Sequence, residues 1–176
     1  FPHLILDNFL DENFFEKIDV DEIKRNQKEG LIFNTDIEKN KWTSKNTKLN
    51  KNISQIVNEL YKKEFIENLS KLTQIKELFS TNAGNTALAN YHEMYDSGFL
   101  GTHVDHSSEP NSGLPHVLNI ILYLSKKWDI SWGGSTMFAN KNGKKIEKII
   151  DYIPNRAVIF LHTPFTFHGV TEIKNN

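Results

Sequence analysis

The chain has 176 residues and no cysteine, so we expect one domain whose core needs no disulfide, and thiolate catalysis and iron–sulfur clusters are excluded. Its 38% hydrophobic and 24% charged residues are typical of a globular protein, and a formal net charge of −1 gives no electrostatic reason to bind nucleic acid or an anionic membrane. No apolar run approaches membrane-spanning length and no signal peptide is recognisable, so we expect a soluble, cytoplasmic protein.

The N-terminal half is predicted to be mostly helical. The apolar run HLILD (3–7) is typical of a short strand, whereas DENFFEKI (11–18) opens with acidic residues that favour a helix N-terminus. Residues 21–50 are polar and predict no element. Apolar residues then recur at helical spacing and predict two helices over about 51–79, whose apolar face is more simply core than a binding surface.

The C-terminal half is predicted to be a series of short strands separated by Gly, Pro, Asn and Asp. The expected strands cover residues 86–95, 99–106, 116–125, 133–140, 144–150, 156–162 and 165–173. Helices followed by many short strands favour a β-sandwich or barrel with helices on one side.

The stretch HVDH (103–106) carries the first candidate site. Side chains alternate along a strand, so His103 and Asp105 would share one face and His106 the other. Such a pair could hold a divalent metal, orient a catalytic base or share a hydrogen bond, and the motif alone does not decide.

A tyrosine is expected beside this pair. DSG (96–98) has the composition of a three-residue hairpin loop, with Gly98 able to adopt a left-handed conformation. Counting back along that hairpin places Tyr91 opposite His103, on the same face of the sheet.

A metal site needs at least a third ligand. Four histidines would face away or lie at strand starts, where exposed histidines are ordinary: His3, His92, His106 and His116. His162 and His168 remain, and FHGV places His168 inside a strand, followed by a glycine that gives access. Two His and one Asp form the facial triad that binds non-haem Fe(II), although zinc stays an alternative.

Three stretches carry a family resemblance: YDSGFLGTHVDH, LNIILYLSKKWDISWGGSTMF and IPNRAVIFLHTPFTFHGVTEI. Together they resemble the iron(II)/2-oxoglutarate-dependent dioxygenases, in particular the prolyl-hydroxylase-like branch. The resemblance implies a mainly β fold with supporting helices (α+β), a double-stranded β-helix or jelly-roll, cupin-like barrel with N-terminal helices packed on one sheet. It implies one domain over 1–176, with helical support over about 9–80 and a barrel core over about 85–176.

The resemblance also implies roles for particular residues. Iron would be held by His103, Asp105 and His168, with no catalytic residue beyond these ligands. Tyr123 would contact 2-oxoglutarate, and Tyr91 is a further candidate, although its spacing to His103 is looser than that of the family's tyrosine. Thr136, which follows two glycines, either lines the same pocket or only packs in the core.

The family anchors the distal carboxylate of 2-oxoglutarate with an Arg or Lys nine or ten residues after the last histidine. This position falls at 177 or 178, so we expect the chain to continue beyond Asn176. Arg156 is expected to be structural, and Lys174 to be exposed.

The implied cofactors are Fe(II), 2-oxoglutarate as cosubstrate and O2, with ascorbate as a candidate requirement for turnover. The expected reaction is hydroxylation of an unactivated C–H bond in a prolyl residue of a peptide or in a small metabolite, with no nucleic-acid or membrane partner. The sequences of the loops around 30–50 and 107–115 do not predict the substrate. The alternative is a non-catalytic, cupin-like module that binds a metal or another ligand.

Overall fold

The computed structural model describes residues 2–20, 23, 30–44, 50–80, 89–109 and 112–174. The chain divides into two compact units. The larger unit contains Phe1–Lys17, Ile32–Trp42 and Glu93–Asn176, and the smaller unit contains Ile18–Leu31 and Thr43–His92. The expectation of a single dioxygenase domain over 1–176, with helices packed on one sheet, stays a prediction.

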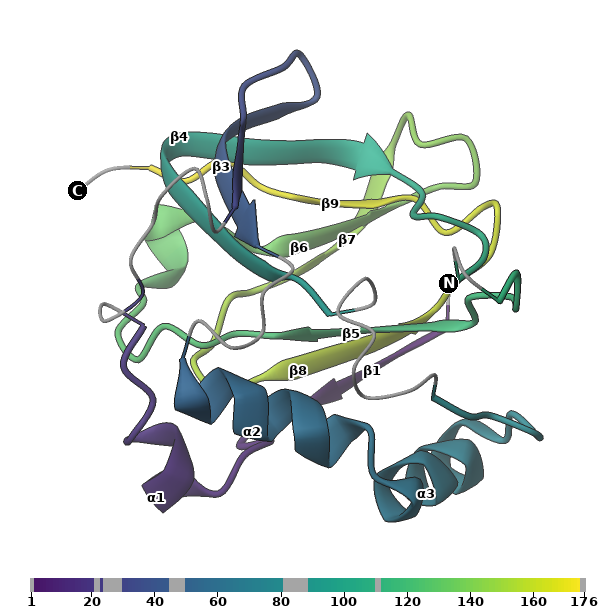
Figure 1. Ribbon diagram of the computed structural model, residues 1–176. Helices are drawn as coiled ribbons and strands as arrows, with labels where there is room; N and C mark the ends of the chain where they lie inside the picture. The colour runs from purple at the N-terminus through teal and green to yellow at the C-terminus, as the bar shows by residue number, and fades with distance from the viewer. Residues whose placement is uncertain are drawn as a thin grey trace. The chain divides into compact units, whose positions relative to one another are not determined.

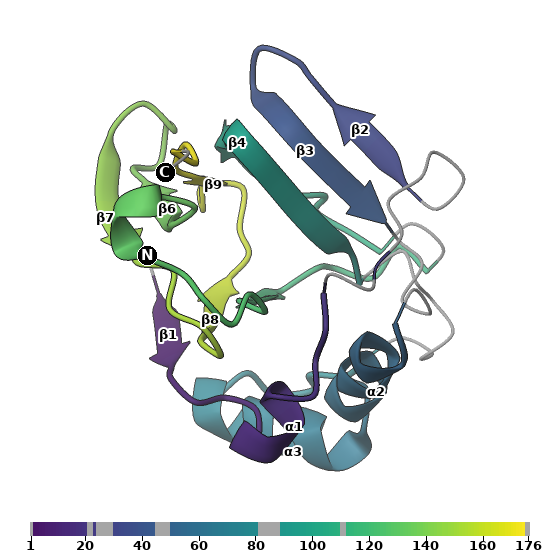
Figure 2. The same cartoon turned by 90° about the vertical axis from the view of Figure 1, so that its left-hand side faces the viewer.

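The strands of the described ranges form two sheets (Figure 1). The three-stranded sheet has the order β1 (His3–Leu6), β8 (Ala157–Leu161), β5 (Leu118–Leu122). The six-stranded sheet has the order β2 (Leu31–Phe33), β3 (Glu38–Ser44), β4 (Tyr91–His103), β9 (His168–Val170), β6 (Thr136–Ala139), β7 (Ile146–Ile150). Figure 2 shows β2, β3 and β4 side by side at one end of the larger sheet. The pairs β1–β8, β5–β8, β4–β9, β6–β9 and β6–β7 are antiparallel.

The core of the larger unit lies where side chains of both sheets meet. Phe138 of β6 and Phe160 of β8 are 2% and 1% exposed, and their ring centroids lie 5.2 Å apart in an edge-to-face arrangement. Tyr123, Ile150 and Val158 complete this cluster. Burying each large apolar side chain stabilises the fold by about 1.5–3 kcal/mol.

The chain moves from one sheet to the other after β1, β4, β5, β7 and β8. The mainly β architecture with few helices is therefore confirmed, and the repeated crossing is consistent with the predicted double-stranded β-helix.

The predicted helices are present but shorter than expected. The smaller unit contains α2 (Lys51–Leu60), whose N-terminus is capped by Asn50, and α3 (Lys63–Thr73), which ends at left-handed Gln74. The larger unit contains α1 (Glu12–Phe15), capped by Asp11. No helix in the described ranges is long and apolar enough to cross a membrane.

The N-terminal strand is confirmed as β1, whereas the polar region 21–50 holds strands that its composition did not predict. Both β2 and β3 lie there, while residues 21–22, 24–29 and 45–49 of this region lie outside the described ranges. In the other half, the strands expected from 116 to 173 correspond to β5 to β9, each shorter than its predicted range.

The predicted hairpin at DSG (96–98) is wrong, because β4 runs without a turn from Tyr91 to His103. The Ser97 N–H donates to the Ile173 carbonyl at 2.8 Å, and the Ile173 N–H donates to the Gly98 carbonyl at 2.8 Å. Ser97 and Gly98 thus lie together opposite Ile173, and two residues opposite one form a β-bulge. The left-handed residue is Ser97 (φ 58°), and Gly98 is required because a Cβ there would lie 2.6 Å from the Tyr95 carbonyl oxygen. Residues 86–88 of the predicted first strand lie outside the described ranges.

Candidate metal centre

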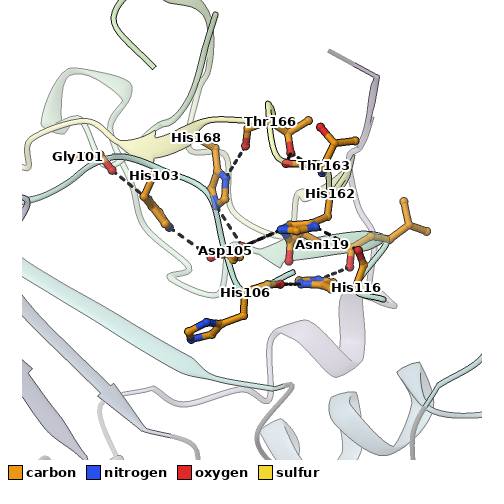
Figure 3. A network of polar contacts seen from close by, with 11 residues as sticks. Gly101, His103, Asp105, His106, His116, Asn119, His162, Thr163, Thr166 and His168 are labelled. Atoms are coloured by element: carbon orange, nitrogen blue, oxygen red, sulfur yellow. Dashed lines mark hydrogen bonds and ion pairs between the residues drawn. The ribbon is translucent and has the colours of Figure 1, made fainter. Parts of the chain in front are cut away.

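Three side chains from distant parts of the sequence converge at one end of β4. His103 is the last residue of β4, Asp105 follows it, and His168 opens β9 in register with His103. Their ligand atoms all lie within 4.8 Å of one another, and Figure 3 shows both rings directed at the carboxylate. Within the described ranges this is the one cluster of His, Asp and Glu suited to a metal ion.

The convergence is as expected, but strand alternation is not its cause. The strand ends at His103, so Asp105 lies in the segment that leaves the sheet. Across the ladder Leu100 pairs with Val170 and His103 with His168, so three steps on β4 match two on β9. This irregularity sets the direction of His103, and the turn of the chain after it brings Asp105 alongside.

The outer nitrogen of each ligand ring lies against a backbone carbonyl. His103 Nδ1 lies 3.0 Å from the Gly101 oxygen, and His168 Nδ1 lies 3.2 Å from the Thr166 oxygen. A carbonyl accepts only, so each Nδ1 carries a proton and each ring directs its Nε2 inward. Such contacts fix tautomer and orientation in metal-binding histidines.

The two Nε2 atoms and the Asp105 carboxylate oxygens lie so close together that a positive charge between them is favoured. His103 Nε2 lies 3.3 Å from Asp105 Oδ1, and His168 Nε2 lies 3.4 Å from Asp105 Oδ2. Burial alone would lower the pKa of His103, but the carboxylate of Asp105 and the Gly101 carbonyl together raise it. Burial alone would raise the pKa of Asp105, but its hydrogen bonds with His103 and His168 lower it strongly. A divalent cation among these atoms would supply the charge that protons otherwise provide.

Two residues of the facing sheet support the ligands. The Asn119 amide donates to Asp105 Oδ2 at 2.8 Å, and the Phe160 ring packs on His168 with centroids 4.7 Å apart. The sequence prediction missed the contact of Asn119. Its signal was a polar residue inside the apolar run LNIIL of β5.

The rings of His116 and His162, near the centre, hydrogen-bond the backbone and do not face the proposed metal site. His162, the other candidate for the third ligand, is buried, and its ring nitrogens lie 3.1 Å from the His116 oxygen and 3.2 Å from the Asp105 backbone oxygen. Its ring stacks on His116 at 4.5 Å. His106 is exposed and points away from the three ligands in Figure 3.

Two of the three expected cosubstrate contacts, Tyr123 and Thr136, lie side by side, whereas Tyr91 does not lie where it was expected. Tyr123 and Thr136 are buried, and their side-chain oxygens lie 2.6 Å apart. The pairing of Tyr91 with His103 across a hairpin is wrong, because both residues lie on β4 at its opposite ends. A role of any of these three in cosubstrate binding stays a prediction.

The basic residues near the C-terminus behave as expected. Arg156 forms a two-point ion pair with Asp7, with Nε–Oδ1 at 2.5 Å and Nη2–Oδ2 at 3.0 Å, which suits a structural role. Lys174 is exposed. The anchor expected beyond Asn176 stays a prediction.

The comparisons agree with this centre. The sequence profile of the 2OG-Fe(II) oxygenase superfamily matches residues 87–176. The chain therefore belongs to the 2OG-Fe(II) oxygenase superfamily. It is similar in structure to a crystal structure of a Pseudomonas putida prolyl-4-hydroxylase, with a TM-score of 0.59 and 14% identity over 98% of this chain and 86% of that chain. At this identity the likeness shows a shared fold. No curated protein matches the chain.

The residues present fit the metal that this family implies. Membership implies Fe(II), 2-oxoglutarate and O2. Two imidazoles and one carboxylate form the donor set of non-haem Fe(II) oxygenases. A structural zinc site would more often be closed by four protein ligands.

Proposed function

We propose that this protein is an Fe(II)- and 2-oxoglutarate-dependent dioxygenase that hydroxylates an unactivated C–H bond. The observation that carries the proposal is the convergence of His103, Asp105 and His168, with both outer ring nitrogens held by carbonyls. Family membership supplies the reaction class, and the geometry supplies the residues.

The three side chains would hold Fe(II) on one side and leave three coordination positions for cosubstrate and O2. When bound, the metal supplies the oxidising chemistry in which O2 and 2-oxoglutarate become CO2, succinate and one hydroxyl group on the substrate. The protein's own part is to orient the ligands. Gly101 and Thr166 do this for the rings through their backbone carbonyls.

The Tyr123–Thr136 pair is suited to the distal carboxylate of 2-oxoglutarate. The two hydroxyls hold two protons, and the 2.6 Å bond between them uses one. The Tyr123 oxygen also accepts from the Thr136 N–H at 3.3 Å. One hydroxyl proton is therefore left for a third group, and a carboxylate accepts such a bond well.

Prolyl residues in peptides are the first substrate class to test. The structural similarity to a protein described as a prolyl-4-hydroxylase supports this choice, at an identity of 14%. Small metabolites are the second class, because the loops around the site are free to vary on a shared fold.

The test is succinate release from 2-oxoglutarate by anaerobically iron-loaded protein, measured with panels of prolyl peptides and small metabolites. We expect succinate and a hydroxylated product in equal amounts with the correct substrate, and neither with Asp105→Ala. Tight metal binding without succinate release in any panel would favour the cupin-like binding module. Activity with Zn2+ in place of Fe(II) would contradict an oxidative mechanism.

A further inference from the structure

Asn119 is the one side chain of the facing sheet that hydrogen-bonds a ligand of the proposed metal within the described contacts. It lies on β5 opposite Phe160 of β8, and antiparallel partners share a face. From this face Phe160 packs on His168 and Asn119 donates to Asp105. The three-stranded sheet thus supports two of the three ligands, one through packing and one through a hydrogen bond.

The two carboxylate oxygens of Asp105 are nearly equivalent toward the histidines. Oδ1 lies 3.3 Å from His103 Nε2, and Oδ2 lies 3.4 Å from His168 Nε2. The hydrogen bond from Asn119, 2.8 Å to Oδ2, distinguishes them. An amide facing a carboxylate must present its NH2 group, so the direction of this bond is fixed.

This hydrogen bond has two physical effects. It occupies a lone pair and draws charge from Oδ2, which leaves Oδ1 as the stronger donor to a cation. It also opposes rotation of the carboxylate about Cβ–Cγ, because rotation would break a charge-assisted bond. A carboxylate that used both oxygens would occupy two coordination positions instead of one.

We infer that Asn119 is a positioning residue that makes Asp105 bind the metal through Oδ1 alone and thereby keeps a coordination position open. The inference rests on the metal-binding part of the proposed function. It predicts that loss of the amide donor brings Oδ2 into the coordination sphere and displaces one bound water.

The test uses Mn2+, which does not react with O2, and water-proton relaxation, which reports the number of exchanging waters on the metal. Asn119→Leu removes the donor at similar size, and Asn119→Val removes it with a smaller apolar side chain. Ile120→Val, at the next position of β5, controls for disturbance of the strand. Thermal melts establish that each variant is folded.

We expect the parent to hold three waters and the Asn119 variants two, so that relaxivity per bound Mn2+ falls by about one third. Affinity for Mn2+ should fall about 10–100-fold in Asn119→Leu, as for other partners of metal ligands. Asn119→Val should show the same fall in relaxivity, because its side chain also lacks a donor. Ile120→Val should match the parent.

If Asn119→Leu does not fold, Asn119→Val decides. Unchanged relaxivity in a folded, Mn2+-loaded Asn119 variant would overturn the inference and leave the proposed function standing. A parent chain that binds no Mn2+ would overturn both.

Discussion

The replacement Asp105→Ala tests the centre most directly. Asp105 supplies the one negative charge among the three proposed ligands, and its loss leaves two neutral imidazoles. We expect the variant to fold, yet to lose the thermal stabilisation that a divalent ion gives the parent by binding the native state.

The size of the effect follows from linkage. Mn2+ at 100 times its dissociation constant stabilises a one-site native state by about 2.7 kcal/mol. For a chain of 176 residues, about 1 kcal/mol corresponds to about 2–4 °C in Tm, so the parent should gain about 5–11 °C.

The metal-free variant should remain folded for a structural reason. The Asp105 side chain is 34% exposed, so its removal opens no apolar cavity. The main loss is the acceptor of the Asn119 amide, which costs about 1–3 kcal/mol at most.

Melting curves recorded over a Mn2+ titration measure this effect. Asp151→Ala, an equal change of charge at an exposed residue outside the centre, should keep the full shift. An Asp105→Ala protein that retains the parent's shift would show that the carboxylate is not a ligand, and the assignment of the site would fail.

Three further predictions concern other residues. Tyr123→Phe should weaken 2-oxoglutarate binding by about 1.5–3 kcal/mol in calorimetry, and an unchanged affinity would show that the hydroxyl serves only Thr136. Phe138→Ala should lower the free energy of unfolding in urea by about 3–5 kcal/mol, since the ring is 2% exposed, and a loss under 1 kcal/mol would contradict its place in the core. The hydrogen bond with Arg156 lowers the pKa of Asp7, so their pair stabilises the fold above the ordinary aspartate pKa and loses this effect as pH falls through the lowered value. Asp7→Asn should therefore cost up to about 1 kcal/mol at pH 7 and progressively less as the pH falls below the ordinary aspartate pKa, and a cost that does not change with pH would exclude the ion pair as its source.

The sequence alone determined which side chains were candidates for a metal centre and that the fold is mainly β. The strand pattern left His103 and Asp105 with either His162 or His168 as candidate ligands, and the family resemblance selected His168. The two helices of the smaller unit were predictable from apolar spacing, which depends on local geometry.

Only the tertiary structure decided how β4 is built. DSG carries the composition of a turn, yet it forms a bulge because Ser97 and Gly98 both pair with Ile173, more than 70 residues later in the chain. Local propensity cannot report a partner so far away. The wrong position of Tyr91 followed directly from this error.

Pairing between distant segments also decides how the proposed metal ligands are positioned. Alternation along a strand predicted that His103 and Asp105 share a face, but a shift in the pairing with β9 and the end of β4 bring them together. The hydrogen bond from Asn119 to Asp105 depends on one sheet facing the other. A single sequence specifies which side chains can bind a metal, whereas the pairing of distant strands decides where each one points.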